Sequence, residues 1–446
     1  MLKKSELMFS NKAIYSLLLP LVGEQFLAML IGMADTYMVS SCGEAVVSGV
    51  SLVDSIAQLM IQLFAAFATG GAVISSQYLG QRNRGAACTA AKQLMYISLA
   101  AGLAMLLLLP AKRAVLCAMF PTAEAEVVLN ADIYFFYVLL SFPFLALYSS
   151  SAALFRSMGN SKLSLKVSVA MNSINVAGNA ALIYGLRLGA AGAGLSTMLS
   201  RIVGALIMLV LLCGEENQIY IHRPLHFEWN SGMVKRILKI GVPSGIENSI
   251  FHVGKILVQT FMARLGMIAM AANAIANSVA YIANIPGNAI GLAAVTVVGQ
   301  CIGADRKEQA RHYGKKLLLL GYACMLSLAA LIFAFAPQII RMFRLGEETS
   351  ALAAGVVRTC MAALVLWPPS FIGPNILRAA GDAKFTMYIS TISMWLFRVL
   401  LSYVLALRTG LGLYGVWLGM YCDWLFRCAV YLLRLHGSRW LEKKAV

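Results

Sequence analysis

The chain is built from long apolar runs separated by short polar joints, and this pattern excludes a water-soluble fold. Of its 446 residues, 60% are hydrophobic and only 12% are charged, whereas soluble domains carry about a quarter charged residues. A membrane-spanning helix needs about 20 mainly apolar residues in succession. The pattern therefore predicts an all-α polytopic membrane protein with twelve spans, whose loops are too short to hold a separate catalytic domain.

The predicted transmembrane helices follow directly from the apolar runs. They lie near residues 14–39, 46–76, 90–110, 130–155, 164–186, 190–213, 238–263, 270–300, 315–336, 352–377, 386–408 and 411–433.

Basic residues are concentrated in alternate loops of this arrangement. With both termini on the inner side, 24 of the 36 Lys and Arg residues fall in inner segments, including Lys3, Lys4 and Arg223. Because loops rich in Lys and Arg remain cytoplasmic, we expect a multi-pass protein of the plasma membrane with cytoplasmic N and C termini. The net charge of +17 then reflects topology, and we expect membrane lipid rather than nucleic acid as a partner.

Residues typical of metal sites and of enzymes are scattered along the chain. The nine cysteines contain no Cys-x-x-Cys pair, which indicates neither disulfides nor a metal site. Neither paired Asp-rich motifs nor a Ser/His arrangement is present in the sequence. We therefore expect no metal, no cofactor and no enzymatic activity.

The second half of the chain repeats the first. A shift of 223 residues aligns Pro20 with Pro243 and Glu24 with Glu247, and a shift of 222 aligns residues 154–162 with 376–384. The repeat predicts two six-helix lobes with pseudo-symmetry about an axis along the membrane normal, a recognised transporter architecture. The predicted domains are the N-terminal lobe 1–213, a cytoplasmic linker 214–237, the C-terminal lobe 238–436 and a basic tail 437–446.

Ionisable groups inside the first predicted span are candidates for function, because each costs about 2.5–3.5 kcal/mol at a helix centre. Glu24 and Asp35 share one helix face about 16 Å apart, and Pro20 permits a bend beside them. We interpret Pro20 as a hinge and Asp35 as a titratable switch, with simple solvation of Asp35 as the alternative. For Glu24, capping of the backbone that Pro20 leaves unpaired is an equal alternative to a role in transport.

The seventh predicted span carries a second polar set. Pro243 and Glu247 repeat the first-span element, and Asn248, His252 and Lys255 follow at offsets of four and seven that place them on one face. This stripe either lines a substrate cleft between the lobes or joins helices.

Two further polar sets are interpreted as structural. Asp54, Gln58 and Gln62 form a stripe that favours helix packing. Asp423 and Arg427 are spaced to satisfy each other, together with Arg398.

Several of these segments together resemble the multidrug and toxic compound extrusion (MATE) family. The resemblance rests on Pro20-Leu-Val-Gly-Glu24 with Gly32-Met-Ala-Asp35-Thr36, on residues 77–81, on Leu154-Phe-Arg-Ser-Met-Gly-Asn160, and on their counterparts in the second half. It covers about 430 residues and implies twelve helices in a V-shaped pair of lobes that work by alternating access. The implied activity is export of small amphipathic, often cationic, organic compounds in exchange for H⁺ or Na⁺.

The resemblance also suggests roles for particular residues. Asp35 takes the place of the coupling carboxylate, and its companions correspond to Tyr134 or Tyr137, Asn175, Asn179 and Thr197. We place Asp35, Tyr134, Asn175, Asn179 and Thr197 in the ion-coupling site, and Tyr137, Glu24, Glu247, Asn248, His252 and Lys255 among the substrate-cleft candidates.

Two departures from the family pattern leave the ion and the cargo open. Many members of the family have an aspartate at the position of Asn179, and Lys255 adds a positive charge to the seventh span. A flippase for lipids or lipid-linked sugars from the same superfamily is the alternative function. Because the expected cleft is complete within one chain, we expect a monomer.

Overall fold

The structure, a computed structural model, describes residues 7–222 and 226–446, and every regular element in these ranges is helical. Lys3, Lys4 and Arg223 of the topology prediction lie outside the described residues. The same holds for residues 1–6 of the predicted N-terminal lobe and residues 223–225 of the predicted linker. The helices form two compact units. We call the described residues of Lys12–Gly245 the N-terminal unit, and Ile246–Val446 with residues 7–11 the C-terminal unit.

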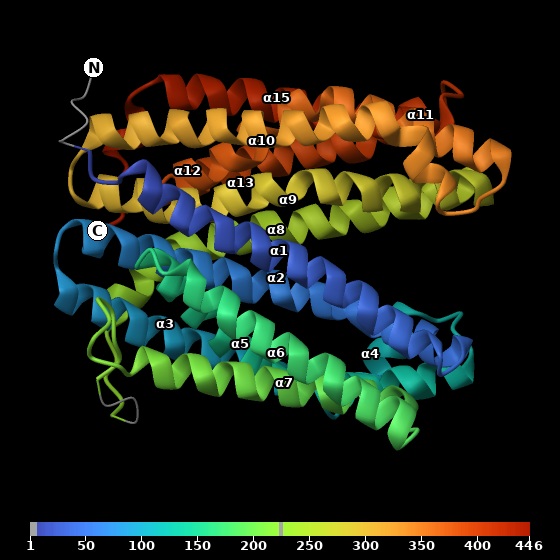
Figure 1. The fold of residues 1–446 in the computed structure, drawn as a ribbon, viewed down its shortest axis with the longest axis horizontal. Helices are drawn as coiled ribbons and strands as arrows, with labels where there is room; N and C mark the ends of the chain where they lie inside the picture. Colours follow the sequence, from blue (N-terminus) through green and yellow to red (C-terminus); the bar gives the residue numbers. More distant parts are fainter. Residues whose placement is uncertain (1–6, 223–225) are drawn as a thin grey trace. The chain divides into compact units, whose positions relative to one another are not determined.

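The N-terminal unit is a bundle organised around one central helix (Figure 1). Its helices are α1 (Asn11–Ser40), α2 (Glu44–Gly80), α3 (Arg84–Met105), α4 (Lys112–Met119), α5 (Ala125–Ser157), α6 (Ser161–Asn179) and α7 (Gly189–Leu212). The long helix α5 packs against α2, α3, α6 and α7. Its apolar side chains Phe135, Leu139 and Phe142 are fully buried in the core of this unit.

The C-terminal unit repeats this plan with more interruptions. Its helices are α8 (Ser231–Met262), α9 (Met267–Gly303), α10 (Lys307–Arg341), α11 (Glu347–Ala363), α12 (Gly373–Ala379), α13 (Ala383–Ser393), α14 (Ser402–Leu407) and α15 (Gly412–His436). The first residues of α8 belong to the N-terminal unit. The helix α9 packs against α10, α11 and α12, and α15 packs against the helices from α11 to α14.

The twelve predicted spans are confirmed as helices, although some are interrupted. Pro368–Ile372 is a π-helical segment that joins α11 to α12, Met394–Leu401 joins α13 to α14 in the same way, and α6 ends in a third such segment, Ala180–Gly185. Among the described residues, ten helices are long and apolar enough to cross a membrane. The other two spans, α6 and α8, contain more polar and charged side chains, and the short helix α4 was not predicted.

The internal repeat is also present in the backbone conformation. Positive φ angles, which residues other than Gly seldom adopt, recur at matched positions of the two halves. The pairs are Gly43 and Gly266, Arg82 and Asp305, Gly159 and Gly381, Arg187 and Gly410, and Gly189 and Gly412. Because each pair marks the same turn between helices, the two halves share their connections as well as their helices.

The boundary between the units differs from the predicted domain boundary, which was drawn at the linker 214–237. The first four turns of α8 belong with the N-terminal unit because α8 approaches α2 very closely at Gly70. A Cβ atom on Gly70 would lie 2.6 Å from the carbonyl oxygen of Ile237 and 2.9 Å from the amide nitrogen of Gly241. Small residues at such crossings let helix backbones meet within a membrane.

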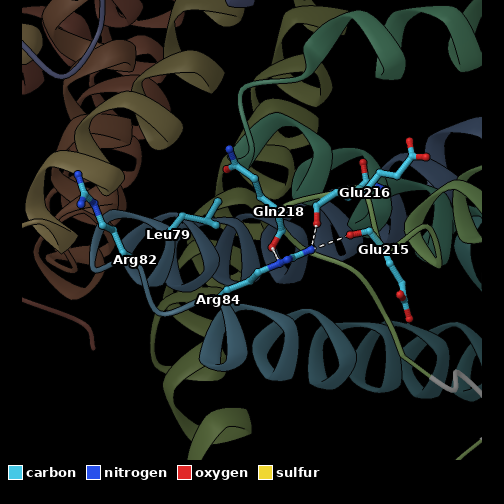
Figure 2. Close-up of a pocket in the computed structure, with 7 residues that line it drawn as sticks. Leu79, Arg82, Arg84, Glu215, Glu216 and Gln218 are labelled. Carbon is cyan, nitrogen blue, oxygen red and sulfur yellow. Dashed lines mark hydrogen bonds between the residues drawn. The ribbon is translucent and has the colours of Figure 1, made fainter.

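Arg84 binds the backbone of the segment that follows α7 (Figure 2). Arg84 donates from Nη2 to the carbonyl oxygens of Glu215 (2.7 Å) and Asn217 (2.6 Å), and from Nε to that of Gln218 (3.1 Å). Leu79, Arg82 and Glu216 complete the lining of the surface pocket at this place. Since Arg84 is occupied by backbone carbonyls, we interpret the pocket as part of the linker attachment.

The crossing at Gly70 gives a testable prediction for stability. Gly70→Ala should lower the free energy of unfolding by about 1–3 kcal/mol, because the added methyl group forces α8 away from α2. Thermal unfolding of the purified protein in detergent measures the change. The matched control is Gly32→Ala in α1, where a Cβ would meet nothing within 4 Å and where stability should be unchanged or higher. Equal effects of the two substitutions would contradict this account of the crossing.

Candidate functional site

Asp35 lies at the centre of a polar cluster inside the N-terminal unit. Asn179 Nδ2 donates to Asp35 Oδ1 at 2.8 Å. When the amide of Asn175 is oriented so that donors face acceptors, its nitrogen lies 2.8 Å and 3.1 Å from the two oxygens of Asp35. The amide oxygen of Asn175 then lies 3.4 Å from Thr197 Oγ1. The helices α1, α6 and α7 therefore bring together four of the five residues predicted for ion coupling.

The fifth residue, Tyr134, reaches the cluster through an aspartate that the sequence analysis had assigned to helix packing. Tyr134 is buried on α5, and its hydroxyl donates to Asp54 Oδ1 at 3.2 Å. Tyr137 is half-buried, packs beside Gly194 and makes no such contact within the described ranges. Of the two tyrosines that the resemblance left open, Tyr134 is the one that joins the cluster.

Asp54 and Arg201 are the charged groups that the sequence analysis missed. Both interact electrostatically with Asp35, and Arg201 Nη1 also donates to Ser141 Oγ at 2.7 Å. Arg201 follows Thr197 by four residues on α7, which places the two side chains on one helix face. A lone arginine in an otherwise apolar span was the signal for this role. We call Asp35, Asp54, Tyr134, Asn175, Asn179, Thr197 and Arg201 the acidic cluster, since it holds two carboxylates and one guanidinium.

Glu24 belongs to a separate ion pair. Its Oε1 atom lies 3.6 Å from Arg156 Nη1, and its Oε2 atom accepts from Ser164 Oγ at 3.0 Å. In the turn before Pro20, Ser161 Oγ donates to the Leu17 carbonyl oxygen at 2.6 Å. The group that Pro20 leaves unpaired is the Ser16 carbonyl oxygen, and an ionised carboxylate, which only accepts hydrogen bonds, does not cap it.

Glu247 makes the same set of contacts in the C-terminal unit. Its Oε1 atom lies 2.8 Å from Arg378 Nη2 and accepts from Ser390 Oγ at 2.7 Å, while its Oε2 atom accepts from Thr386 Oγ1 at 3.2 Å. The shifts that define the repeat match Glu24 with Glu247, Arg156 with Arg378 and Ser164 with Thr386. A carboxylate, a guanidinium and a hydroxyl thus form a duplicated structural unit, and Glu247 is fully engaged in it.

The pairing predicted for α15 is confirmed. Arg427 Nε lies 2.7 Å from Asp423 Oδ1, and Arg398 Nη1 lies 3.5 Å from Asp423 Oδ2. The Ser393 hydroxyl also donates to Asp423 Oδ1, and the aspartate side chain is completely buried. One carboxylate is therefore shared by two arginines and a serine.

The stripe on α8 is partly exposed. Asn248 and His252 are half-buried, whereas Lys255 is exposed. Within the described ranges no carboxylate lies within 4 Å of Lys255, and Glu247 on the same helix pairs with Arg378 instead.

The fold and these sites define a multi-pass helical membrane protein made of two matching halves, and known proteins share this pattern. The MatE family matches residues 20–181 and 243–404. The two matched segments begin 223 residues apart, the same shift that defines the repeat. Since these segments cover most of the chain, it belongs to the MatE family of membrane transporters.

Relatives are similar along the whole chain. An uncharacterized transporter of Bacillus subtilis, YisQ, is 28% identical over 97% of this chain and 95% of its own length. A protein of Thermotoga maritima with the name probable multidrug resistance protein NorM is 28% identical over 100% of this chain and 96% of its own. A crystal structure of MATE in the bent conformation matches 96% of each chain with a TM-score of 0.89 at 22% identity, and confirms the twelve-helix fold.

The duplicated ion pairs give a second testable prediction. Glu247→Gln should destabilise the protein by about 3–5 kcal/mol, because it leaves Arg378 charged, buried and without its carboxylate. Glu24→Gln should cost less, since the distance to Arg156 is longer and the pair is more exposed. Double-mutant cycles of thermal unfolding, with Arg378→Gln and Arg156→Gln as second changes, measure both couplings. A larger coupling for Glu24 would contradict this ranking.

Proposed function

We propose that the protein is an antiporter that exports small amphipathic organic compounds, often cationic, in exchange for H⁺ or Na⁺. The observation that carries the proposal is Asp35, a carboxylate within a membrane span held by two asparagine amides. Ionisable groups at such depth typically mark ion pathways. The name of the Thermotoga maritima relative supports export of drugs. In this proposal the protein lies in the plasma membrane as a monomer with both termini in the cytoplasm, as the distribution of basic residues indicates.

The acidic cluster can hold either coupling ion. A carboxylate takes up a proton directly, and oxygen atoms of carboxylate, amide and hydroxyl groups are ligands that hard cations prefer. Asn179 Oδ1 is a buried acceptor without a hydrogen-bond partner among the described residues. Such an acceptor is costly when it stays unpaired, and a bound cation would satisfy it. This favours an ion that binds beside Asp35 on the side of Asn179 Oδ1, because Asn179 Nδ2 occupies the space between the two side chains.

The proposed coupling acts through helix α1. Pro20 lies inside α1 and interrupts its backbone hydrogen bonds one turn from Glu24. Ion binding at Asp35 would neutralise a charge on the same helix and so favour one of two conformations of α1. Export then requires that ion and cargo prefer different conformations.

The role of Asp35 is tested by transport. Asp35→Asn should abolish gradient-driven export, because the amide cannot exchange a proton or neutralise a cation. The measurement is release of a fluorescent lipophilic cation from proteoliposomes under imposed proton and sodium gradients, compared side by side. Asp132→Asn is the matched control, because Asp132 pairs with Lys112 away from the acidic cluster. Retained driven export in folded Asp35→Asn protein would refute the role of this carboxylate.

The asparagine on α6 gives a further prediction. Asn179→Ala should lower the rate of gradient-driven export at least about tenfold, since a hydrogen bond to a charged group contributes about 1.5–3 kcal/mol. Asn172→Ala is the control on the same helix, where the amide donates to Ser168 Oγ at 3.2 Å instead of to a carboxylate. The same liposome assay applies. Equal rates for the two variants would remove Asn179 from the proposed ion site.

A further inference from the structure

One face of α8 carries a row of polar side chains. At about 100° per residue, Asn248, His252, Lys255 and Gln259 lie within about 60° of one another. Lys255 and Gln259 are exposed. This row extends over three turns of the membrane-spanning part of the helix.

The opposite face of α8 is exposed and apolar. Ile246, Val253 and Leu257 have exposed fractions of 43%, 42% and 38%, and helical geometry places them about 160–180° from Lys255. An apolar exposed face suits contact with lipid tails. Charged residues within spans almost always face the protein interior or a water-filled cavity, so the two exposed faces of α8 have different surroundings and Lys255 belongs to the aqueous one.

A second cation lies over the same turn of α8. The guanidinium of Arg398 stands 4.9 Å from the ring centre of Phe251, which precedes Lys255 by one turn. Helix α8 approaches the π-helical segment Met394–Leu401 closely, because Gly254 leaves room for the side chain of Met394. Lys255 and Arg398 accordingly interact electrostatically.

The carboxylate of Asp423 is shared by Arg398 and Arg427, so it cannot neutralise both arginines and Lys255 as well. Asp423 binds Arg427 at 2.7 Å and accepts from the Ser393 hydroxyl, whereas its contact with Arg398 is 3.5 Å long. Glu247, the acidic side chain on α8 itself, is taken by Arg378 at 2.8 Å. Arg398, Arg427 and Lys255 together carry three positive charges, and Asp423 carries one negative charge, which leaves an excess of two positive charges. Uncompensated charge at this depth is costly, and an anionic group of a ligand would relieve it.

We propose that the C-terminal unit binds the anionic group of an amphipathic ligand, such as a carboxylate, sulfonate or phosphate, between Lys255 and Arg398. The imidazole of His252 and the amide of Gln259 along the row would bind other polar parts of the same ligand. The inference rests on the proposed export function, and it extends the cargo to acidic and zwitterionic amphiphiles. The acidic cluster of the N-terminal unit then serves the coupling ion, and the basic site serves the cargo.

A matched pair of fluorescent probes tests the site. Dansylglycine carries a carboxylate, and dansylglycinamide is its neutral counterpart. With purified protein in phosphatidylcholine nanodiscs, dansylglycine should bind more tightly than the amide. Lys255→Met should weaken dansylglycine binding at least about tenfold, which corresponds to the loss of about 1.4 kcal/mol, and should leave binding of the amide nearly unchanged.

Two further variants serve as controls. Lys255→Arg keeps the charge and should retain most of the affinity for dansylglycine. Lys235→Met removes an exposed lysine near the start of the same helix and should have no effect. Equal affinities of wild-type protein for the acid and the amide, or an unchanged affinity of folded Lys255→Met protein for the acid, would overturn the proposal.

Two additional measurements are informative. One distinguishes a lipid from a soluble cargo, and the other distinguishes failure of the anion site from failure of the proposed antiport. If phosphatidylglycerol in the nanodiscs competes with dansylglycine, and does not compete in Lys255→Met protein, the site binds a lipid headgroup. If phosphatidylglycerol has no effect, the site binds a soluble cargo. Either result supports an anion site. Because binding is measured without a gradient, it is independent of coupling. If the wild-type protein exports a cation under a gradient but binds dansylglycine no more tightly than the amide, the anion site alone is refuted. If it prefers dansylglycine but shows no gradient-driven export, the antiport alone is refuted.

Discussion

Charged groups inside membrane spans have to be compensated, and this requirement shapes both halves of the protein. The clearest case is a contact that occurs once in each half. In both halves, a glutamate on the first helix binds an arginine and a hydroxyl group that lie further along the chain. Each glutamate lies one turn after a proline, where the helix has lost a backbone hydrogen bond. The ion pair therefore ties a weak point of the helix to its neighbours. Without it, a buried charge would remain next to a break in the helix.

The two halves share this ion pair but differ in the charges of their remaining polar groups. The N-terminal unit combines Asp35 and Asp54 with Arg201, an excess of negative charge. The C-terminal unit combines Asp423 with Arg398, Arg427 and Lys255, an excess of positive charge. The two copies share a scaffold and have opposite polarity. This difference is the basis of the proposed division between a site for the coupling ion and a site for an anionic group.

Sequence patterns predicted much of this arrangement where the interactions are local. The pair of Asp423 and Arg427 follows from a spacing of four residues on one helix. In contrast, no sequence pattern linked Arg156 or Arg378 to its partner, because each binds a glutamate more than 130 residues away in the sequence. Asp54 was assigned to packing for the same reason, since its partner Tyr134 lies on another helix. Spacing within a helix carries no information about which helix stands opposite.

The sequence by itself determined the membrane-spanning helices and their repetition, because apolar length and period are local properties that the bilayer enforces. It also placed Asp35, Asn175, Asn179 and Thr197 in one site through the family resemblance. Only the tertiary structure decided that Tyr134 rather than Tyr137 joins them through Asp54, that the start of α8 packs with the first half, and that Lys255 stays without a carboxylate. These outcomes depend on how closely helix backbones approach at residues such as Gly70 and Gly254. That approach is set by side-chain packing between helices, which no single-helix pattern encodes.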